Sequence, residues 1–354
     1  MKKKIIFICC FVLLVLLSAC NPLFVLRAAY EESKILLGRR DISEVVTDQS
    51  TDSSERLKLE LVLEAREFSA KMGLTPEDSY TMYTKIDRDV LLWVLAGSKP
   101  DAFDLYTWWY PFVGRIPYKG YFERAGAERE AAKLEKKGYE TSIRPSDAFS
   151  TLGWFNDPIL STTLRAHHTE IVGTVIHETL HRTIWIPDQV PFNESLANFV
   201  GYQGAIEMFE QRAASAPIDS KEAFERDLEI ARWNKDAEFE ISDVVVQLYQ
   251  ELNALYESKL DYSEKIKLRD GIFKRLVGPL REKFPDLRIL KAMNNADIMQ
   301  LKFYMTGLRD FQLLYESSQS DWKIFFQKIQ EIKNQIESSK RDPFDLLREL
   351  TRSP

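Results

Sequence analysis

Apolar residues recur along the N-terminal half of the chain with the spacing of helices. Between Leu57 and Met72 they return every three or four positions, as on one face of an α-helix, and Gly73 follows the run. Three consecutive apolar residues before Gly38 predict the end of an earlier helix, and the Ala-, Glu- and Lys-rich stretch 123–137 predicts a surface helix. Helices are therefore expected on both sides of residues 80–120.

Three short segments between these helices have the composition of β-strands. The run 90–95 is entirely apolar, the aromatic stretch 106–113 is interrupted by Pro111, and residues 139–143 alternate in polarity. Strands interspersed with helices predict a mixed sheet with helices packed on it, so we expect an α+β protein.

From residue 205 onward the pattern is almost entirely helical. The periodic segments are 222–233, 241–259, 264–277, 297–315 and 321–337. We therefore expect a core that contains the sheet over residues 56–204, followed by a largely helical C-terminal lobe over residues 205–354.

The first twenty residues have the organisation of a secretion signal. Lys2, Lys3 and Lys4 precede the uncharged apolar run 5–17, which is too short to cross a bilayer comfortably. The sequence Leu-Ser-Ala-Cys that ends at Cys20 then resembles the lipobox of bacterial lipoproteins, in which cleavage before the cysteine precedes lipid attachment. The alternative is an ordinary secretory signal that contains a cysteine.

Cleavage before Cys20 changes the composition of the chain. The 354 residues carry a formal net charge of −6 and three cysteines. Loss of residues 1–19 removes three lysines and two cysteines, so the charge becomes −9 and Cys20 is the one cysteine left. No internal disulfide can then form. Residues 20–55 are expected to be the anchor, helix and tether of a domain in the periplasm, and the acidic balance argues against nucleic-acid binding.

The segment 175–181 contains the pattern H-E-x-x-H. Because residues four apart lie on one face of a helix, His177 and His181 can bind one metal ion, whereas Glu178 lies about 100° around the helix, beside a metal-bound water. Two imidazoles and a carboxylate base are typical of catalytic zinc. Two surface histidines on an ordinary helix are the alternative, which the apolar residues of the same helix disfavour.

Catalytic zinc requires a third protein ligand, for which Glu194 is the strongest candidate. It begins a second helix, and Ala197, Asn198 and Gly201 on the same face are small or polar, so this helix can approach the first closely. Two alternatives remain. Asp188 in the connecting loop is another ligand candidate, and Glu194 could instead serve only as a favourable charge at a helix N-terminus.

Other polar residues near the motif are weaker ligand candidates. His168 precedes His177 by two and a half helical turns, so it lies on the opposite side of a continuous helix. His167 lies farther from His177 along the axis, and Glu170 is about 10 Å from His177 along the helix, so both are too distant to share its metal ion. His167 and His168 are therefore expected to be surface or helix-entry residues.

If the metal-bound water attacks a carbonyl group, the developing oxyanion also requires a hydrogen-bond donor. Tyr118, Tyr121 and Tyr202 are the candidates, each with a packed aromatic ring as the alternative role. The segment 150–155 precedes the motif and is expected to be extended. Such a strand can pair with a peptide backbone or belong to an ordinary core.

These residues resemble those of the zinc metallopeptidases of the gluzincin type, in which a glutamate on the next helix completes H-E-x-x-H. Asn193-Glu194 resembles the Asn-Glu that opens this second helix in thermolysin-like enzymes. More closely, the chain is similar to a bacterial family of putative aminopeptidases. The shared segments are 117–122, 150–158, 175–181, 192–195 and, more weakly, 294–296. The resemblance implies a zincin-like catalytic core with one Zn²⁺ ion bound by His177, His181 and Glu194.

The chain also departs from these relatives. Asn198 stands where thermolysin-like enzymes have an aspartate that orients a histidine, so a second-shell amide would replace a charge. Arg182 follows the second histidine, where an uncharged residue is usual. The Gly-x-Met-Glu-Asn motif of the large aminopeptidase family is missing, so the sequence offers no acidic anchor for a substrate amino terminus.

We therefore expect a zinc-dependent peptidase, an aminopeptidase by its resemblance, anchored to the membrane through lipidated Cys20. Glu178 is expected to act as general base on peptide substrates. Two alternatives stay open: a metallohydrolase of peptidoglycan peptides, and a non-catalytic lipoprotein that keeps the zinc fold for binding or assembly. The sequence favours no oligomeric state.

Overall fold

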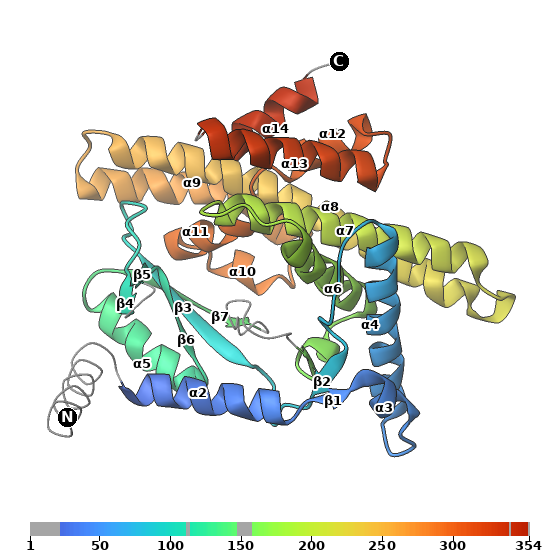
Figure 1. Ribbon diagram of the computed structural model, residues 1–354. Helices are drawn as coiled ribbons and strands as arrows, with labels where there is room; N and C mark the ends of the chain where they lie inside the picture. Colours follow the sequence, from blue (N-terminus) through green and yellow to red (C-terminus); the bar gives the residue numbers. More distant parts are fainter. Residues whose placement is uncertain (1–21, 111–113, 147–157, 340, 353–354) are drawn as a thin grey trace, which may run out of the picture.

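The computed structural model describes residues 22–110, 114–146, 158–339 and 341–352. Helices dominate the structure, and short strands form small sheets beside them (Figure 1), so the expected α+β class is confirmed. The signal sequence with Cys20 and the predicted strand 150–155 lie outside the described residues. No helix in the described ranges combines the length and apolar composition needed to cross a membrane.

The N-terminal half alternates helices with strands of two to seven residues. Its elements are α2 (Pro22–Leu37), β1 (Arg40–Asp41), α3 (Ile42–Thr47), α4 (Ser53–Lys71), β2 (Met82–Thr84), β3 (Leu92–Ser98), β4 (Trp108–Tyr110), β5 (Gly114–Ile116), β6 (Tyr118–Tyr121), α5 (Arg124–Glu135), β7 (Glu140–Ser146) and β8 (Ile159–Leu160). The helices and strands predicted on the described residues of this half are thus present, with ends displaced by up to four residues.

The remainder is helical after the single turn Thr163–Arg165. Its helices are α6 (His168–Thr183), α7 (Val190–Ser215), α8 (Ile218–Glu257), α9 (Tyr262–Lys283), α10 (Arg288–Lys291), α11 (Asn295–Tyr304), α12 (Leu308–Ser317), α13 (Trp322–Ser339) and α14 (Pro343–Arg352). In Figure 1, α8 and α9 run side by side across the upper part of the molecule, with α12, α13 and α14 above them.

The strands do not join into the one mixed sheet that the sequence predicts. β3 pairs with β6 and β7 in an antiparallel sheet, β2 pairs antiparallel with β1 and parallel with β8, and β4 pairs with β5. α5 covers the first of these sheets, where Leu134 packs against Leu95. The strands of the other two sheets have only two or three residues, too few to extend a common ladder.

Two predicted helix boundaries are wrong in the C-terminal half. The segments 222–233 and 241–259 form one helix, α8, because residues 234–240 contain neither glycine nor proline and buried apolar positions continue through Ala237. The segment 297–315 instead divides into α11 and α12 at Gly307, whose φ of 71° lies in the left-handed region that glycine adopts without strain.

One large hydrophobic cluster connects the two halves. It includes the buried face of α4, the apolar residues of α6 and α7, and the inner faces of α12, α13 and α14. Phe199 on α7 stacks on Phe311 of α12, and the Glu207 carboxylate accepts hydrogen bonds of 2.7 Å from Tyr315 and Trp322. The predicted division of the chain at residues 55 and 204 stays a prediction.

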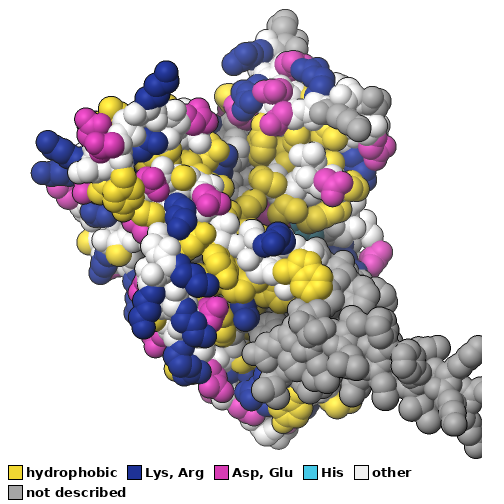
Figure 2. All heavy atoms as spheres, turned by 90° about the vertical axis from the view of Figure 1, so that its left-hand side faces the viewer, with side chains coloured by type: hydrophobic (Ala, Val, Ile, Leu, Met, Phe, Trp, Pro, Cys, Tyr) yellow, Lys and Arg dark blue, Asp and Glu magenta, His cyan; other side chains and the backbone are white. Residues whose placement is uncertain are grey.

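Charged side chains of both signs are interspersed over the face of the molecule shown in Figure 2. Hydrophobic side chains gather along the recess between the two upper parts of this face (Figure 2). The described surface on this side is therefore neither uniformly positive nor uniformly negative.

Helices α6 and α7 approach each other closely at two glycines. A Cβ atom on Gly201 would lie 2.7 Å from the carbonyl oxygen of Gly173 and 3.4 Å from the Cβ atom of His177. The small face predicted for the second helix therefore does allow close packing, while Leu196, Phe199 and Val200 are buried in the core, as expected.

Substitution G201A is expected to force these helices apart. The new methyl group would overlap the Gly173 carbonyl, so we expect the free energy of unfolding to fall by about 1–3 kcal/mol in denaturant titrations of the metal-free protein. The control is G271A on α9, where a Cβ atom meets nothing within 4 Å. There the helix preference for alanine should leave stability equal or raise it by up to about 1 kcal/mol. Equal stability of both variants would contradict the packing argument.

Candidate metal centre

The loop between α6 and α7 determines where Glu194 lies. Asn193 accepts a hydrogen bond of 3.0 Å from the Ile186 backbone nitrogen and donates one of 2.7 Å to the Ile186 carbonyl, and both residues are buried. Pro191 stands in the first turn of α7, where its missing N–H leaves no helical hydrogen bond unmade. The start of α7, and with it Glu194, is thereby fixed relative to the end of α6.

The structure brings together the three residues predicted as metal ligands. The Nε2 atoms of His177 and His181 lie 3.0 Å apart, and Oε2 of Glu194 lies 3.4 Å from the first and 3.5 Å from the second. Their side chains are 14%, 16% and 17% exposed, so the group is largely but not completely shielded from solvent. These three form the one group of potential metal ligands among the described residues.

The chemistry and spacing of this group fit a zinc ion. Four ligands at ~2.0–2.1 Å from tetrahedral zinc are about 3.3 Å from one another, close to the three distances observed. The set of two imidazoles and one carboxylate leaves a fourth position for solvent or substrate, as in catalytic sites. Asp188, the alternative ligand, is exposed in the loop at φ 60° and does not belong to the group.

Charges around the cluster favour a cation. Burial raises the pKa of Glu194, but hydrogen bonds from His177 and His181 outweigh it and lower that pKa to about 2. Burial lowers the pKa of His177, yet hydrogen bonding to Glu194 and the charge of Glu178 bring about a net increase. An ionised carboxylate thus lies between two basic rings, the environment in which a divalent cation replaces protons.

Asn198 connects the cluster to α11. Its side chain hydrogen-bonds the His177 ring, and its amide nitrogen donates a hydrogen bond of 3.0 Å to the Tyr304 carbonyl. The orientation of His177 therefore depends on a helix more than a hundred residues away in the sequence. Asn198 therefore contacts the ring that the sequence predicts it to orient.

Packing, and not a hydrogen bond from the described part of the chain, positions the part of the His181 ring that points away from Glu194. Its Nδ1 atom is buried with no hydrogen-bond partner among the described residues, and its ring contacts Trp185 edge to face at a centroid distance of 5.3 Å. Trp185 is 41% exposed, so an exposed aromatic ring lies beside His181.

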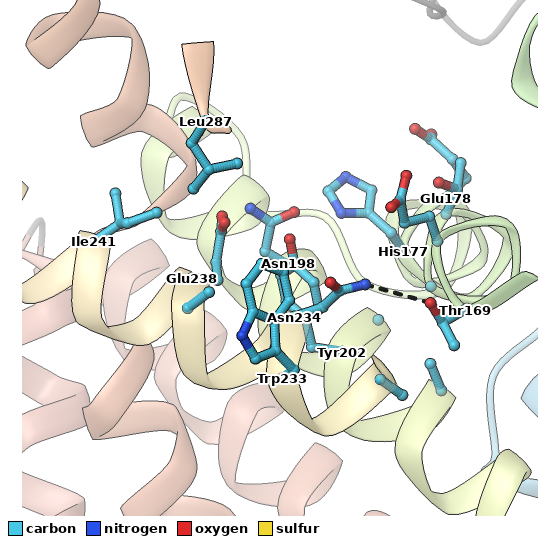
Figure 3. A pocket seen from close by; sticks show the side chains of 17 residues that line it. Thr169, His177, Glu178, Asn198, Tyr202, Trp233, Asn234, Glu238, Ile241 and Leu287 are labelled. Atoms are coloured by element: carbon cyan, nitrogen blue, oxygen red, sulfur yellow. Dashed lines mark hydrogen bonds between the residues drawn. The ribbon is translucent and has the colours of Figure 1, made fainter. Parts of the chain in front are cut away.

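Glu178 and His177 line a pocket of about 460 Å³ between α6, α7 and α8 (Figure 3). Asn198 and Tyr202 from α7 and Glu238 from α8 line it as well. The expected base and one predicted metal ligand therefore face a cavity large enough for an amino-acid residue.

The three tyrosines proposed as oxyanion donors lie in different places. Tyr202 lines the pocket, but its hydroxyl is hydrogen-bonded to Glu238, and burial raises its pKa. Tyr121 packs in the cluster under α5, where burial raises the pKa of its buried hydroxyl, so it does not join the metal cluster. Tyr118 is 45% exposed on β6 and lies close enough to Tyr304 to affect its pKa.

The remaining histidines lie at the entry of α6, as expected. His167 is the N-cap residue and accepts from the Thr169 backbone nitrogen, and both His167 and His168 lie within 3.6 Å of the Asp227 carboxylate. Glu170 lines the pocket instead of joining the metal cluster.

Sequence reasoning missed Tyr304 at the end of α11, which lies near enough to Glu194 for the carboxylate charge to affect its pKa. Burial and the nearby charge of Glu194 raise its pKa, so its hydroxyl keeps its proton, and Arg144 of β7 hydrogen-bonds to it. No periodicity connects position 304 with the motif at 177–181. The available hint was the weak family resemblance at 294–296, where Asn294 caps α11.

A profile of the protein family described as putative aminopeptidase matches residues 23–343 of the chain. No curated protein and no solved structure matches it. The matched region contains all the residues of the metal cluster and of the pocket.

Substitution E194Q is expected to weaken metal binding. The amide lacks the charge that the two imidazoles face, so we expect zinc affinity, measured by competition with a chromophoric chelator, to fall at least tenfold. Variant H181A should lose more zinc affinity than E194Q, because it removes a proposed ligand nitrogen. Variant H168Q, which changes a histidine outside the cluster, should bind one zinc ion as the parent does. Unchanged affinity in E194Q and H181A would exclude this site.

Proposed function

This chain belongs to the putative aminopeptidase family, and we propose that it is a zinc-dependent peptidase of the gluzincin type. The family name indicates a peptidase, which is a hydrolase. The observation that carries the zinc proposal is the triangle of 3.0, 3.4 and 3.5 Å between the ligand atoms of His177, His181 and Glu194. In this proposal α6 and α7 are the two helices of a zincin-like core.

Zinc, when bound, would supply a Lewis acid that lowers the pKa of water and polarises a substrate carbonyl. Glu178 follows a proposed ligand in the chain and lines the pocket beside it. Its carboxylate accepts a proton from the attacking water and delivers it to the leaving nitrogen as the C–N bond breaks. A metal site with a purely structural role would need no such carboxylate, so this arrangement favours catalysis over a binding role.

Tyr304 is the best-supported donor to the developing oxyanion. Its raised pKa keeps the hydroxyl protonated at neutral pH, and it lies near Glu194 on the side of the cluster that α11 covers. Arg144 hydrogen-bonds to it and stabilises negative charge there. The three tyrosines selected from the sequence have less support, because Tyr202 is paired with Glu238 and Tyr121 packs under α5.

The proposal includes attachment to the cell envelope through lipidated Cys20, with the described domain in the periplasm. The support is the sequence of residues 1–20, in which basic, apolar and Leu-Ser-Ala-Cys segments follow one another. α2 begins at Pro22, directly after the proposed attachment point.

Substitution E178Q is expected to separate catalysis from folding. The amide cannot accept a proton, so hydrolysis of a peptide mixture, followed by mass spectrometry, should fall about 10²–10⁴-fold. Zinc content and the denaturation midpoint should stay unchanged. The matched control is E229Q on the exposed side of α8, which should hydrolyse peptides as the parent does. Parent-level activity in E178Q would show that another group is the base.

Substitution C20S tests the anchor separately. Without the thiol no lipid can be attached, so labelling with radioactive palmitate should be lost and the protein should leave the membrane fraction. Variants C9S and C10S, within the apolar run, should be labelled and fractionate like the parent. Membrane retention and labelling of C20S would contradict the lipoprotein proposal.

A further inference from the structure

Acidic residues from two helices line the pocket beside the proposed metal ligands. Glu170, Glu178 and Glu238 are among its lining residues, whereas none of the described residues that line it is a lysine or an arginine. The pocket begins at His177 and reaches α8, so it extends from the proposed reaction centre to a wall contributed by the C-terminal half (Figure 3).

Glu170 and Glu238 are the acidic lining residues that the proposed mechanism does not use, and Glu238 is the one on α8. Burial raises the pKa of Glu238 to about 7, and the hydrogen bond from Tyr202 only partly offsets this. Lys235, the nearest lysine in the sequence, donates to Gln203 instead. A desolvated carboxylate whose partner is a neutral hydroxyl gains stability when a cation binds beside it.

Around Glu238, on the side of the pocket that faces α6, the lining is apolar. Trp233, Ala237, Ile241 and Leu287 line this side, and the Trp233 ring contacts Phe284 edge to face at a centroid distance of 5.8 Å. Trp233 is 54% exposed, so its ring is not buried by the protein itself. An apolar side chain bound there would bury part of this surface.

We propose that Glu238 binds the protonated α-amino group of a peptide whose first side chain is apolar, so that the enzyme releases amino-terminal residues. This inference rests on the proposed peptidase function and names its substrate class. Glu238, Trp233 and Ile241 all lie on the α8 wall, so a peptide bound there by its ammonium group and first side chain would extend its first carbonyl toward the α6 wall, which contributes His177 and Glu178. Tyr202 acts as a positioning residue, because its hydroxyl orients the Glu238 carboxylate.

Charge selection makes the inference testable with one pair of peptides. The zinc-loaded full chain would be assayed on Leu-Ala-Ala-Phe and on its N-acetylated form, which has no positive charge. The parent should cleave the free peptide with a kcat/KM at least 100-fold higher. Variant E238Q should lose at least tenfold in kcat/KM on the free peptide, mostly through KM, and should be unchanged on the acetylated peptide. The control E229Q should keep the full preference.

Comparison of E238Q with E238D distinguishes loss of the charge from a folding defect. E238D keeps the negative charge, so it should retain more of the preference for the free peptide than E238Q. Both substitutions change a side chain of α8, so a difference between them reflects the charge. Denaturation midpoints of all variants would be compared. Retention of the parent's preference by E238Q, or equal cleavage of both peptides by the parent, would overturn the anchor while leaving the peptidase proposal intact.

Binding distinguishes failure of the anchor from failure of the peptidase proposal. Calorimetric titration of both peptides into E178Q and into the double variant E178Q/E238Q requires no turnover. If the parent cleaves neither peptide, the peptidase proposal fails, but tighter binding of the free peptide that is lost in the double variant still supports the anchor. Equal binding of both peptides by E178Q would overturn it.

Discussion

The close contact of α6 with α7 is the constraint on which the candidate site depends. Because Gly173 and Gly201 carry no side chains, the backbones of the two helices approach near enough for Glu194 to reach His177 and His181. Asn193 fixes the position of α7 along the pair through its two hydrogen bonds to Ile186. The separation of α6 and α7 therefore controls the distance from Glu194 to the two histidines. The loop between these helices controls the position of Glu194 along them.

Helices of the C-terminal half contribute side chains and backbone contacts to the candidate site. α11 receives the hydrogen bond from Asn198 and presents Tyr304, and the Ser195 hydroxyl accepts a hydrogen bond of 3.0 Å from the Thr306 backbone nitrogen beyond it. α8 contributes the opposite wall of the pocket, with Glu238. The polar side chains of α7 that face these helices thus hold together residues that are about one hundred positions apart.

The parts of the fold that could be predicted are those governed by neighbouring residues. The apolar period of 57–72 and the glycine after it correspond to α4, which ends at Lys71, and Asp52 caps its first turn. The helix boundaries near 233–241 and 297–315 were wrong. Local periodicity does not show whether a helix continues through a polar stretch or ends at one glycine. The pairing of strands in separate small sheets depends on contacts between distant segments.

The sequence by itself determined the three candidate ligands and the candidate base. Helical spacing places His177 and His181 on one face, and the prolines before Glu194 predict that a second helix begins there. The sequence could not determine what surrounds them. Tyr304 and Glu238 lie far from the motif along the chain and follow no shared period with it. Their places depend on how whole helices pack, since a tertiary contact is set by the shapes of two surfaces and leaves no signal in either segment alone.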